Sequence, residues 1–330
     1  MQTEKHILVG TGGPGGIQVL ELGPKRLRAT AHGGPACASF LIAGPDGLVL
    51  AGIEADSFQG IPGGGAVSFR LENGQVRLCG AVTGLGRGIC HVAAAPRRRL
   101  VFAASYPEGS VDVLSLGKSG ELTPLGRLCR TGAGPHPEQT GPHAHCCVVT
   151  PDEETLYVCD LGTDEIACYA LDDLRNQWAL PLPPASGPRH LVLGEDPRFL
   201  YAACELSNEV LVLRAKDGTV LQRVNCRPQA GKFCALSSIR WLPGGNGLAV
   251  GCRGQDGVWL LPLLRPGVLG TPAFFAARAR SPWDVVPLGG GLFAAAFAGS
   301  GCVELGRCTG EGWKAEQVCP VPRPTCLLIG

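Results

Sequence analysis

One pattern returns along the whole of this 330-residue chain. It consists of a turn containing Gly, Ser or Pro, an apolar strand, a second turn, and two further apolar strands. Its successive starts fall at Pro35, Gly88, Pro142, Pro188, Leu236, Pro282 and Pro324, in steps of 53, 54, 46, 48, 46 and 42 residues. A period of roughly forty to fifty residues with several strands per unit, and no competing helical periodicity, is typical of a β-propeller. We therefore predict an all-β fold, a seven-bladed β-propeller.

The two chain ends together supply the last blade. The unit that begins at Pro324 stops after one strand, whereas residues 6–10 and 17–22 read as two strands with no first strand before them. Joining these segments closes the ring and pairs sheet edges that would otherwise lie open. Because dividing the chain would leave the ring open, we predict a single propeller domain over residues 1–330.

Composition and charge exclude several other classes of protein. Hydrophobic residues make up 45% of the chain, the net charge is +1, and basic residues are scattered apart from Arg97, Arg98 and Arg99. A nucleic-acid-binding face needs concentrated positive charge, so we expect no nucleic-acid partner. Residues 1–6 do not resemble a secretion signal, and no apolar run approaches the roughly 18 residues of a membrane span. We expect a cytoplasmic protein without a membrane partner.

Sixteen cysteines are spread through the chain, many of them inside apolar, strand-like segments. Without a secretion signal, they are expected to be small buried residues in a reducing compartment. The sequence contains no Cys-x-x-Cys pair, so a zinc ribbon is disfavoured. The run from His143 to Cys147 contains soft metal ligands, but neighbouring strand residues face opposite ways. We predict no metal and no cofactor.

Several spaced motifs resemble the seven-bladed lactonase family, which includes the propeller type of 6-phosphogluconolactonase and the fungal carboxymuconate cyclases. The match is densest from Gly132 to Asp256, and its first segment, Gly132 to His145, contains Gly141-Pro142-His143-Ala144-His145. Other matches are Gly63-Gly64-Gly65-Ala66-Val67, Gly187-Pro188-Arg189-His190, Glu205-Leu206-Ser207 and Cys252-Arg253-Gly254-Gln255-Asp256. The resemblance covers nearly the whole chain and implies the same fold and a lactone substrate.

The resemblance also implies a set of catalytic residues, which are His143, Arg189, Glu205 and Arg253. A propeller brings equivalent positions of different blades around one central opening, so these four can converge. We expect Glu205 or His143 to act as the general base and the two arginines to hold an anionic group. Strand alternation predicts that His190 points away from Arg189 and is a structural residue. The resemblance favours His143 over His145 as the histidine that faces the centre.

Two kinds of position depart from the family pattern. Cys204 and Cys252 stand where Asn is usual, and Trp283 stands where many relatives carry Arg.

The leading prediction is a carboxylic ester hydrolase that converts 6-phosphogluconolactone to 6-phosphogluconate, with a small sugar lactone or other acidic lactone as its partner. A muconate-type lactonising enzyme, and a non-catalytic propeller that binds a sugar acid or a protein, are the alternatives. The sequence does not predict an oligomeric state.

Overall fold

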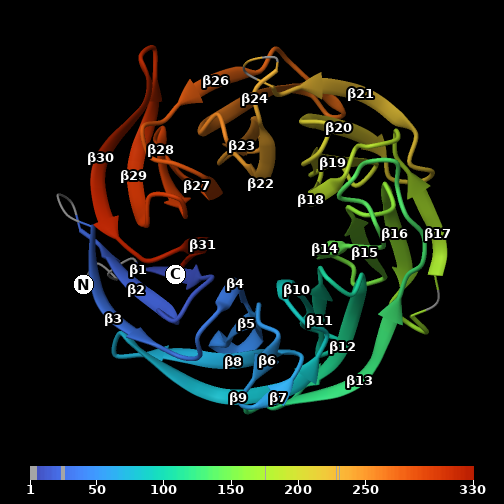
Figure 1. Ribbon diagram of the computed structural model, residues 1–330, viewed down its shortest axis with the longest axis vertical. Helices are drawn as coiled ribbons and strands as arrows, with labels where there is room; N and C mark the ends of the chain where they lie inside the picture. Colours follow the sequence, from blue (N-terminus) through green and yellow to red (C-terminus); the bar gives the residue numbers. More distant parts are fainter. Residues whose placement is uncertain (1–5, 24–26, 175, 228, 230) are drawn as a thin grey trace.

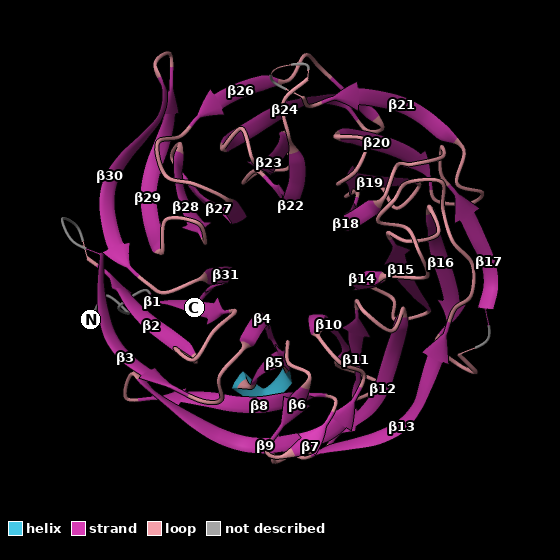
Figure 2. Cartoon of the chain, in the orientation of Figure 1, coloured by secondary structure: helices cyan, strands magenta, loops and turns pink. Residues whose placement is uncertain are grey.

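The computed structural model describes residues 6–23, 27–174, 176–227, 229 and 231–330. In this part of the chain, seven antiparallel sheets follow one another around a central opening, which confirms the predicted seven-bladed β-propeller (Figure 1). The helical content of the described residues is a single 3-10 turn, η1 (Pro45–Gly47), shown in cyan in Figure 2.

Each blade begins with a strand beside the central opening. These innermost strands are β4 (Ala38–Ala43), β10 (Ile89–Ala95), β14 (Ala144–Val149), β18 (Pro188–Leu193), β22 (Ala235–Trp241), β27 (Pro282–Gly289) and β31 (Pro324–Ile329). Next to them lie β5 (Val49–Ile53), β11 (Leu100–Ser105), β15 (Thr155–Asp160), β19 (Phe199–Cys204), β23 (Gly247–Arg253), β28 (Leu292–Phe297) and β1 (His6–Thr11). The starts of the innermost strands, and the apolar runs of both sets of strands, agree with the repeat in the sequence.

Two further strands complete each blade on its outer side. The third strands are β8 (Gly64–Glu72), β12 (Ser110–Leu116), β16 (Glu165–Ala170), β20 (Glu209–Arg214), β24 (Gly257–Arg265), β29 (Cys302–Thr309) and β2 (Ile17–Leu22). The outer strands are β9 (Gln75–Leu85), β13 (Leu122–Cys129), β17 (Asn176–Pro181), β21 (Val220–Asn225), β26 (Ala273–Ala276), β30 (Gly312–Pro320) and β3 (Leu27–Gly33). Two short hairpin elements are added: β6 (Ser57–Phe58) with β7 (Ile61–Pro62), and β25 (Val268–Leu269) beside β24.

The outer strands are the part of the blade that the repeat did not predict, since it indicated three strands per unit. The reason is their exposure: five of the eight residues of β13, for example, are consecutively exposed. An exposed edge strand carries no apolar run from which it could be recognised.

The hydrophobic core lies mainly between consecutive blades. One buried cluster combines Tyr201 and Val212 of one blade with Leu236 and Val250 of the next. The ring is closed by strand pairing within one blade, since Leu8 of β1 pairs with Leu328 of β31 in an antiparallel register. The two chain ends therefore form one blade, as predicted, and β31 contributes its inner strand.

A one-residue β-bulge interrupts every innermost strand near its start. In six blades a single residue has no partner on the neighbouring strand, and these residues are Ser39, Cys90, His145, Arg189, Trp283 and Thr325. In the remaining blade Ser237 and Ser238 together face Gly251. A bulge redirects side chains and breaks the regular alternation of a strand. This repeated irregularity positions the site described below.

Candidate functional site

The bulges surround one cavity at the centre of the ring. All six unpaired bulge residues line it: Ser39, Cys90, His145, Arg189, Trp283 and Thr325. A second layer of lining residues comes from the end of the second strand of four blades, where Glu54, Tyr106, Glu205 and Arg253 lie. The cavity therefore collects equivalent positions from blades that are distant in the sequence.

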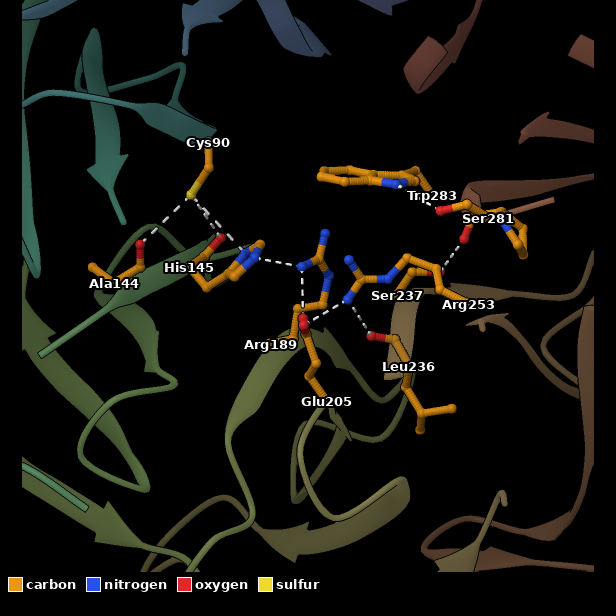
Figure 3. Close-up of polar contacts among 11 residues, drawn as sticks. Cys90, Ala144, His145, Arg189, Glu205, Leu236, Ser237, Arg253, Ser281 and Trp283 are labelled. Carbon is orange, nitrogen blue, oxygen red and sulfur yellow. Dashed lines mark hydrogen bonds and ion pairs between the residues drawn. The ribbon is translucent and has the colours of Figure 1, made fainter. Parts of the chain in front are cut away.

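Glu205 joins two arginines into one buried cluster (Figure 3). One of its carboxylate oxygens accepts from Arg189 Nη1 at 2.7 Å and the other from Arg253 Nη2 at 2.7 Å. Burial alone would raise the pKa of Glu205, but the positive charges of Arg189 and Arg253 outweigh it and hold this pKa at about 2. Glu205 is therefore ionised at neutral pH. Two guanidinium groups and one carboxylate leave the cluster with a net positive charge.

His145 also contacts the guanidinium group of Arg189. Arg189 Nη1 lies 2.6 Å from His145 Nε2, and because arginine can only donate, Nε2 must accept. The imidazole proton is then on Nδ1, which faces the Cys90 sulfur at 4.0 Å. Burial and the charge of Arg189 hold the pKa of His145 well below its ordinary value. His145 is thus a neutral residue that orients Arg189.

Trp283 covers both guanidinium groups. The guanidinium carbons of Arg189 and Arg253 lie 5.4 and 5.2 Å from the centre of its indole ring. In Figure 3 the second terminal nitrogen of each arginine carries no dashed line to the residues drawn. The Nε atoms of both arginines are also buried without a hydrogen-bond partner among the described residues. Donor groups are therefore present in this cluster for an anionic ligand.

The structure brings three of the four predicted site residues together and leaves His143 outside the cavity lining. The His143 ring stacks on Tyr106, with ring centroids 4.4 Å apart and planes 9° from parallel. Its Nδ1 lies 2.9 Å from the Tyr106 carbonyl oxygen, and its backbone N–H donates to Asp160. His143 thus supports Tyr106, whose side chain does line the cavity. The central position that the family motif assigned to His143 is taken by His145, which is the extra residue of a bulge.

His190 differs from the sequence prediction for the same reason. Regular alternation would point it away from Arg189, yet both residues line the cavity. Arg189 is the unpaired bulge residue, whereas His190 is paired with Ala203. Burial and the nearby Arg189 charge hold the pKa of His190 well below its ordinary value, so it is neutral.

Sequence reasoning missed several lining residues. Glu54 and Tyr106 directly follow the second strands β5 and β11, as Glu205 directly follows β19. Aligning the repeats on the end of the second strand, rather than on its beginning, would have found both. Cys90 and Ser39 could not have been found in this way, because their orientation depends on the bulges.

Three further findings concern metal ligands, membrane-spanning helices and the cysteines. Among the residues that the structure describes, no group of three or more His, Cys, Asp or Glu side chains is arranged to hold a metal ion. In the same ranges, no helix has the length and apolar character needed to cross a membrane. All sixteen cysteines are free thiols in this structure.

The fold and the buried arginine cluster define a propeller whose centre can bind an anionic small molecule. Comparison with known families identifies the group: the family model described as "Lactonase, 7-bladed beta-propeller" matches residues 6–328. The chain therefore belongs to the seven-bladed β-propeller lactonase family.

Individual relatives are similar at moderate identity. A 6-phosphogluconolactonase of Bacillus subtilis is 28% identical over 249 residues, which cover 71% of this chain and 66% of the relative. An uncharacterised protein of Lactococcus lactis is 31% identical over 208 residues, covering 60% of this chain and 57% of that protein. The chain thus spans less than two thirds of the length of these two curated relatives. A solved structure of a periplasmic gluconolactonase from Pseudomonas aeruginosa superposes with a TM-score of 0.87 at 26% identity, covering 99% of both chains.

Proposed function

We propose that this protein hydrolyses the lactone ring of an acidic sugar, most concretely 6-phosphogluconolactone to 6-phosphogluconate. One observation carries the proposal: Glu205 holds Arg189 and Arg253 side by side in the central cavity. Hydrolysis of a lactone places negative charge on the carbonyl oxygen and then produces a carboxylate. Preorganised guanidinium donors stabilise both species.

The roles of the cluster follow from its protonation. Glu205 has both oxygens engaged and a pKa of about 2, so it is a weak base. We assign it the role of fixing the two arginines in place. His145 accepts from Arg189 through Nε2 and is assigned the same kind of role. His143 acts one step further away, through Tyr106.

A second hollow supports a phosphorylated substrate. It shares Glu205 with the central cavity, and its lining includes Arg227 and Lys232 as well as Glu138. Cationic side chains beside the arginine cluster are suited to a phosphate group held at a distance from the lactone ring. This arrangement favours 6-phosphogluconolactone over the unphosphorylated lactone.

A lactone panel tests the proposal. The purified protein is assayed by pH-stat against 6-phosphogluconolactone, gluconolactone and simple aliphatic lactones, with spontaneous hydrolysis subtracted. We expect acid release above background, highest for the phosphorylated lactone, and its loss in Arg189→Ala. Arg198→Ala is the matched control, because Arg198 is an exposed arginine of the turn before β19 whose side chain pairs with Asp196. Wild-type protein that releases no acid from any lactone would overturn the proposal. Adding cis,cis-muconates to the panel tests the lactonising alternative.

A further inference from the structure

We propose that Glu54 is the residue that transfers the proton in this site, taking it from the attacking water and returning it to the ring oxygen. The inference rests on the proposed lactone hydrolysis and names a catalytic residue that neither the sequence motifs nor the cluster around Glu205 indicated. It follows from comparing the carboxylates that the cavity contains.

Three carboxylates line the cavity, and two of them are engaged by arginines. Glu205 bridges the two site arginines. Asp284 accepts from Arg240 Nε at 3.1 Å and Nη2 at 2.8 Å, and also from the Leu327 backbone N–H at 3.0 Å. Glu54 makes no ion pair with an arginine or lysine within the described ranges, and the nearby Ser39 hydroxyl lowers its pKa. Only Glu54 among the three can gain and lose a proton without breaking an ion pair.

The fold places Glu54 across the cavity from the arginines. It directly follows β5, as Glu205 directly follows β19, and the two blades are three apart in the ring of seven. The Glu54 backbone N–H donates to the Cys37 carbonyl oxygen at 2.9 Å, which holds the start of this loop against β4. A lactone between the two sides has its carbonyl oxygen beside the guanidinium groups and its attacking water beside Glu54.

The surroundings of Glu54 suit a general base. Burial raises the pKa of Glu54 above its ordinary value of 4.5, although the Ser39 hydroxyl and the charges of Arg189 and Arg323 lower it in part. The thiols of Cys37 and Cys90 also lie near enough to interact with its charge. A carboxylate with a raised pKa abstracts a proton from water more readily than one held at about 2.

The proton and the electrons balance in two steps. In the first, the water oxygen forms a bond to the carbonyl carbon, its proton passes to the Glu54 carboxylate, and the carbonyl electron pair moves onto the oxygen that faces the arginines. In the second, that pair reforms the carbonyl, the bond to the ring oxygen breaks, and the departing oxygen takes the proton from Glu54. The products are one hydroxy acid and the original carboxylate, with water as the sole co-reactant.

Glu54→Gln tests the role directly, assayed on the best substrate of the lactone panel. We expect kcat to fall by roughly 10² to 10⁴-fold, the range for a lost acid–base group, while KM changes by less than about threefold. Calorimetric binding of 6-phosphogluconate should be retained, because the arginine cluster is intact. Glu154→Gln is the matched control, since Glu154 is an exposed residue of the turn before β15.

Ser39→Ala supplies a second test that keeps the carboxylate. Removing the hydroxyl removes an interaction that lowers the pKa of Glu54, so that pKa rises further. The decrease of kcat at low pH, which is the acidic limb of its pH profile, should therefore move to higher pH in Ser39→Ala. It should disappear in Glu54→Gln. An active wild type, with Glu54→Gln retaining both kcat and the limb, overturns the Glu54 assignment alone. An inactive wild type overturns the proposed hydrolysis, and the assignment with it.

Discussion

Arg189 donates a hydrogen bond to His145 across two neighbouring blades, with 2.6 Å between Nη1 and Nε2. Since the guanidinium has no acceptor, this contact selects the imidazole tautomer with its proton on Nδ1. We expect nitrogen NMR of histidine-labelled protein to show this neutral tautomer for His145 at pH 6. A positively charged His145 at that pH would contradict the assigned role.

The same contact makes folding stability depend on pH. The pKa of His145 is held well below 6.5 in the folded protein, mainly by burial and secondly by Arg189. The unfolded chain therefore binds more protons as the pH falls below about 6.5, and the folded state loses stability. We expect wild type to lose about 1 kcal/mol more than His145→Gln between pH 6.5 and 5.5, measured by urea unfolding. Equal losses in the two proteins would argue against a buried neutral His145.

Replacing Glu205 by Gln should damage both stability and turnover. Two buried arginines would then lose their shared counter-charge, and breaking a buried pair lowers the unfolding free energy by roughly 3–5 kcal/mol. Because the folded pKa of about 2 lies below the ordinary 4.5, this contribution is fully present above pH 4.5. The stability difference between wild type and Glu205→Gln should shrink as the pH falls from about 4.5 toward 2. A difference that is constant over this range would show that the carboxylate charge is not responsible.

Trp283 should affect substrate affinity more than the rate of reaction. Its indole ring lies against both guanidinium groups, and each such contact contributes roughly 0.5–2 kcal/mol. We expect Trp283→Ala to raise KM about 5- to 30-fold, and Trp283→Phe to raise it less. Trp178→Phe serves as a control, because Trp178 packs on Tyr157 at the outer strand β17. An unchanged kcat/KM in Trp283→Ala would contradict a role in holding the arginines.

The two histidines of the Gly-Pro-His-Ala-His motif should respond differently to substitution. His145 contacts Arg189 directly, whereas His143 reaches the cavity through the Tyr106 backbone and ring. Loss of a hydrogen bond to a charged group is worth about 1.5–3 kcal/mol, so His145→Ala should lower kcat/KM by roughly 10- to 100-fold. His143→Ala should lower it less than tenfold. The opposite order would restore His143 as the principal histidine of the site.

The strand that closes the ring, β31, should contribute as much to the free energy of unfolding as a strand in the middle of the chain. Leu327 of β31 is buried in a cluster with Ile7 and Val9 of β1. We expect Leu327→Ala to lower the unfolding free energy by about 2–5 kcal/mol, close to the effect of Leu213→Ala in β20. Chemical denaturation of the two variants side by side makes the comparison. A much smaller effect at Leu327 would show that the ring does not need to be closed.

Periodicity and the motifs of the sequence were sufficient to predict the ring, its seven blades and its closure by the two chain ends. Apolar runs repeat because the inner strands are buried between blades, and buried positions of a strand carry apolar residues. The exposed outer strands, such as β13, lack that signal. The convergence of Arg189, Glu205 and Arg253 was also predicted, because equivalent turns of a closed ring must meet at its centre.

The orientation of individual side chains was decided only by the tertiary structure. The family motif pointed to His143 at the centre, and alternation turned His190 away from Arg189. The bulge residues are instead His145 and Arg189, and both share the cavity with His190. The protonation of the carboxylates was likewise undetermined by residue type, since Glu205 lies between two arginines whereas Glu54 does not. The sequence determined which residues reach the centre of the ring by their place in the repeat. Packing between blades decided which of them face one another, because a one-residue shift in pairing reverses the direction of a side chain.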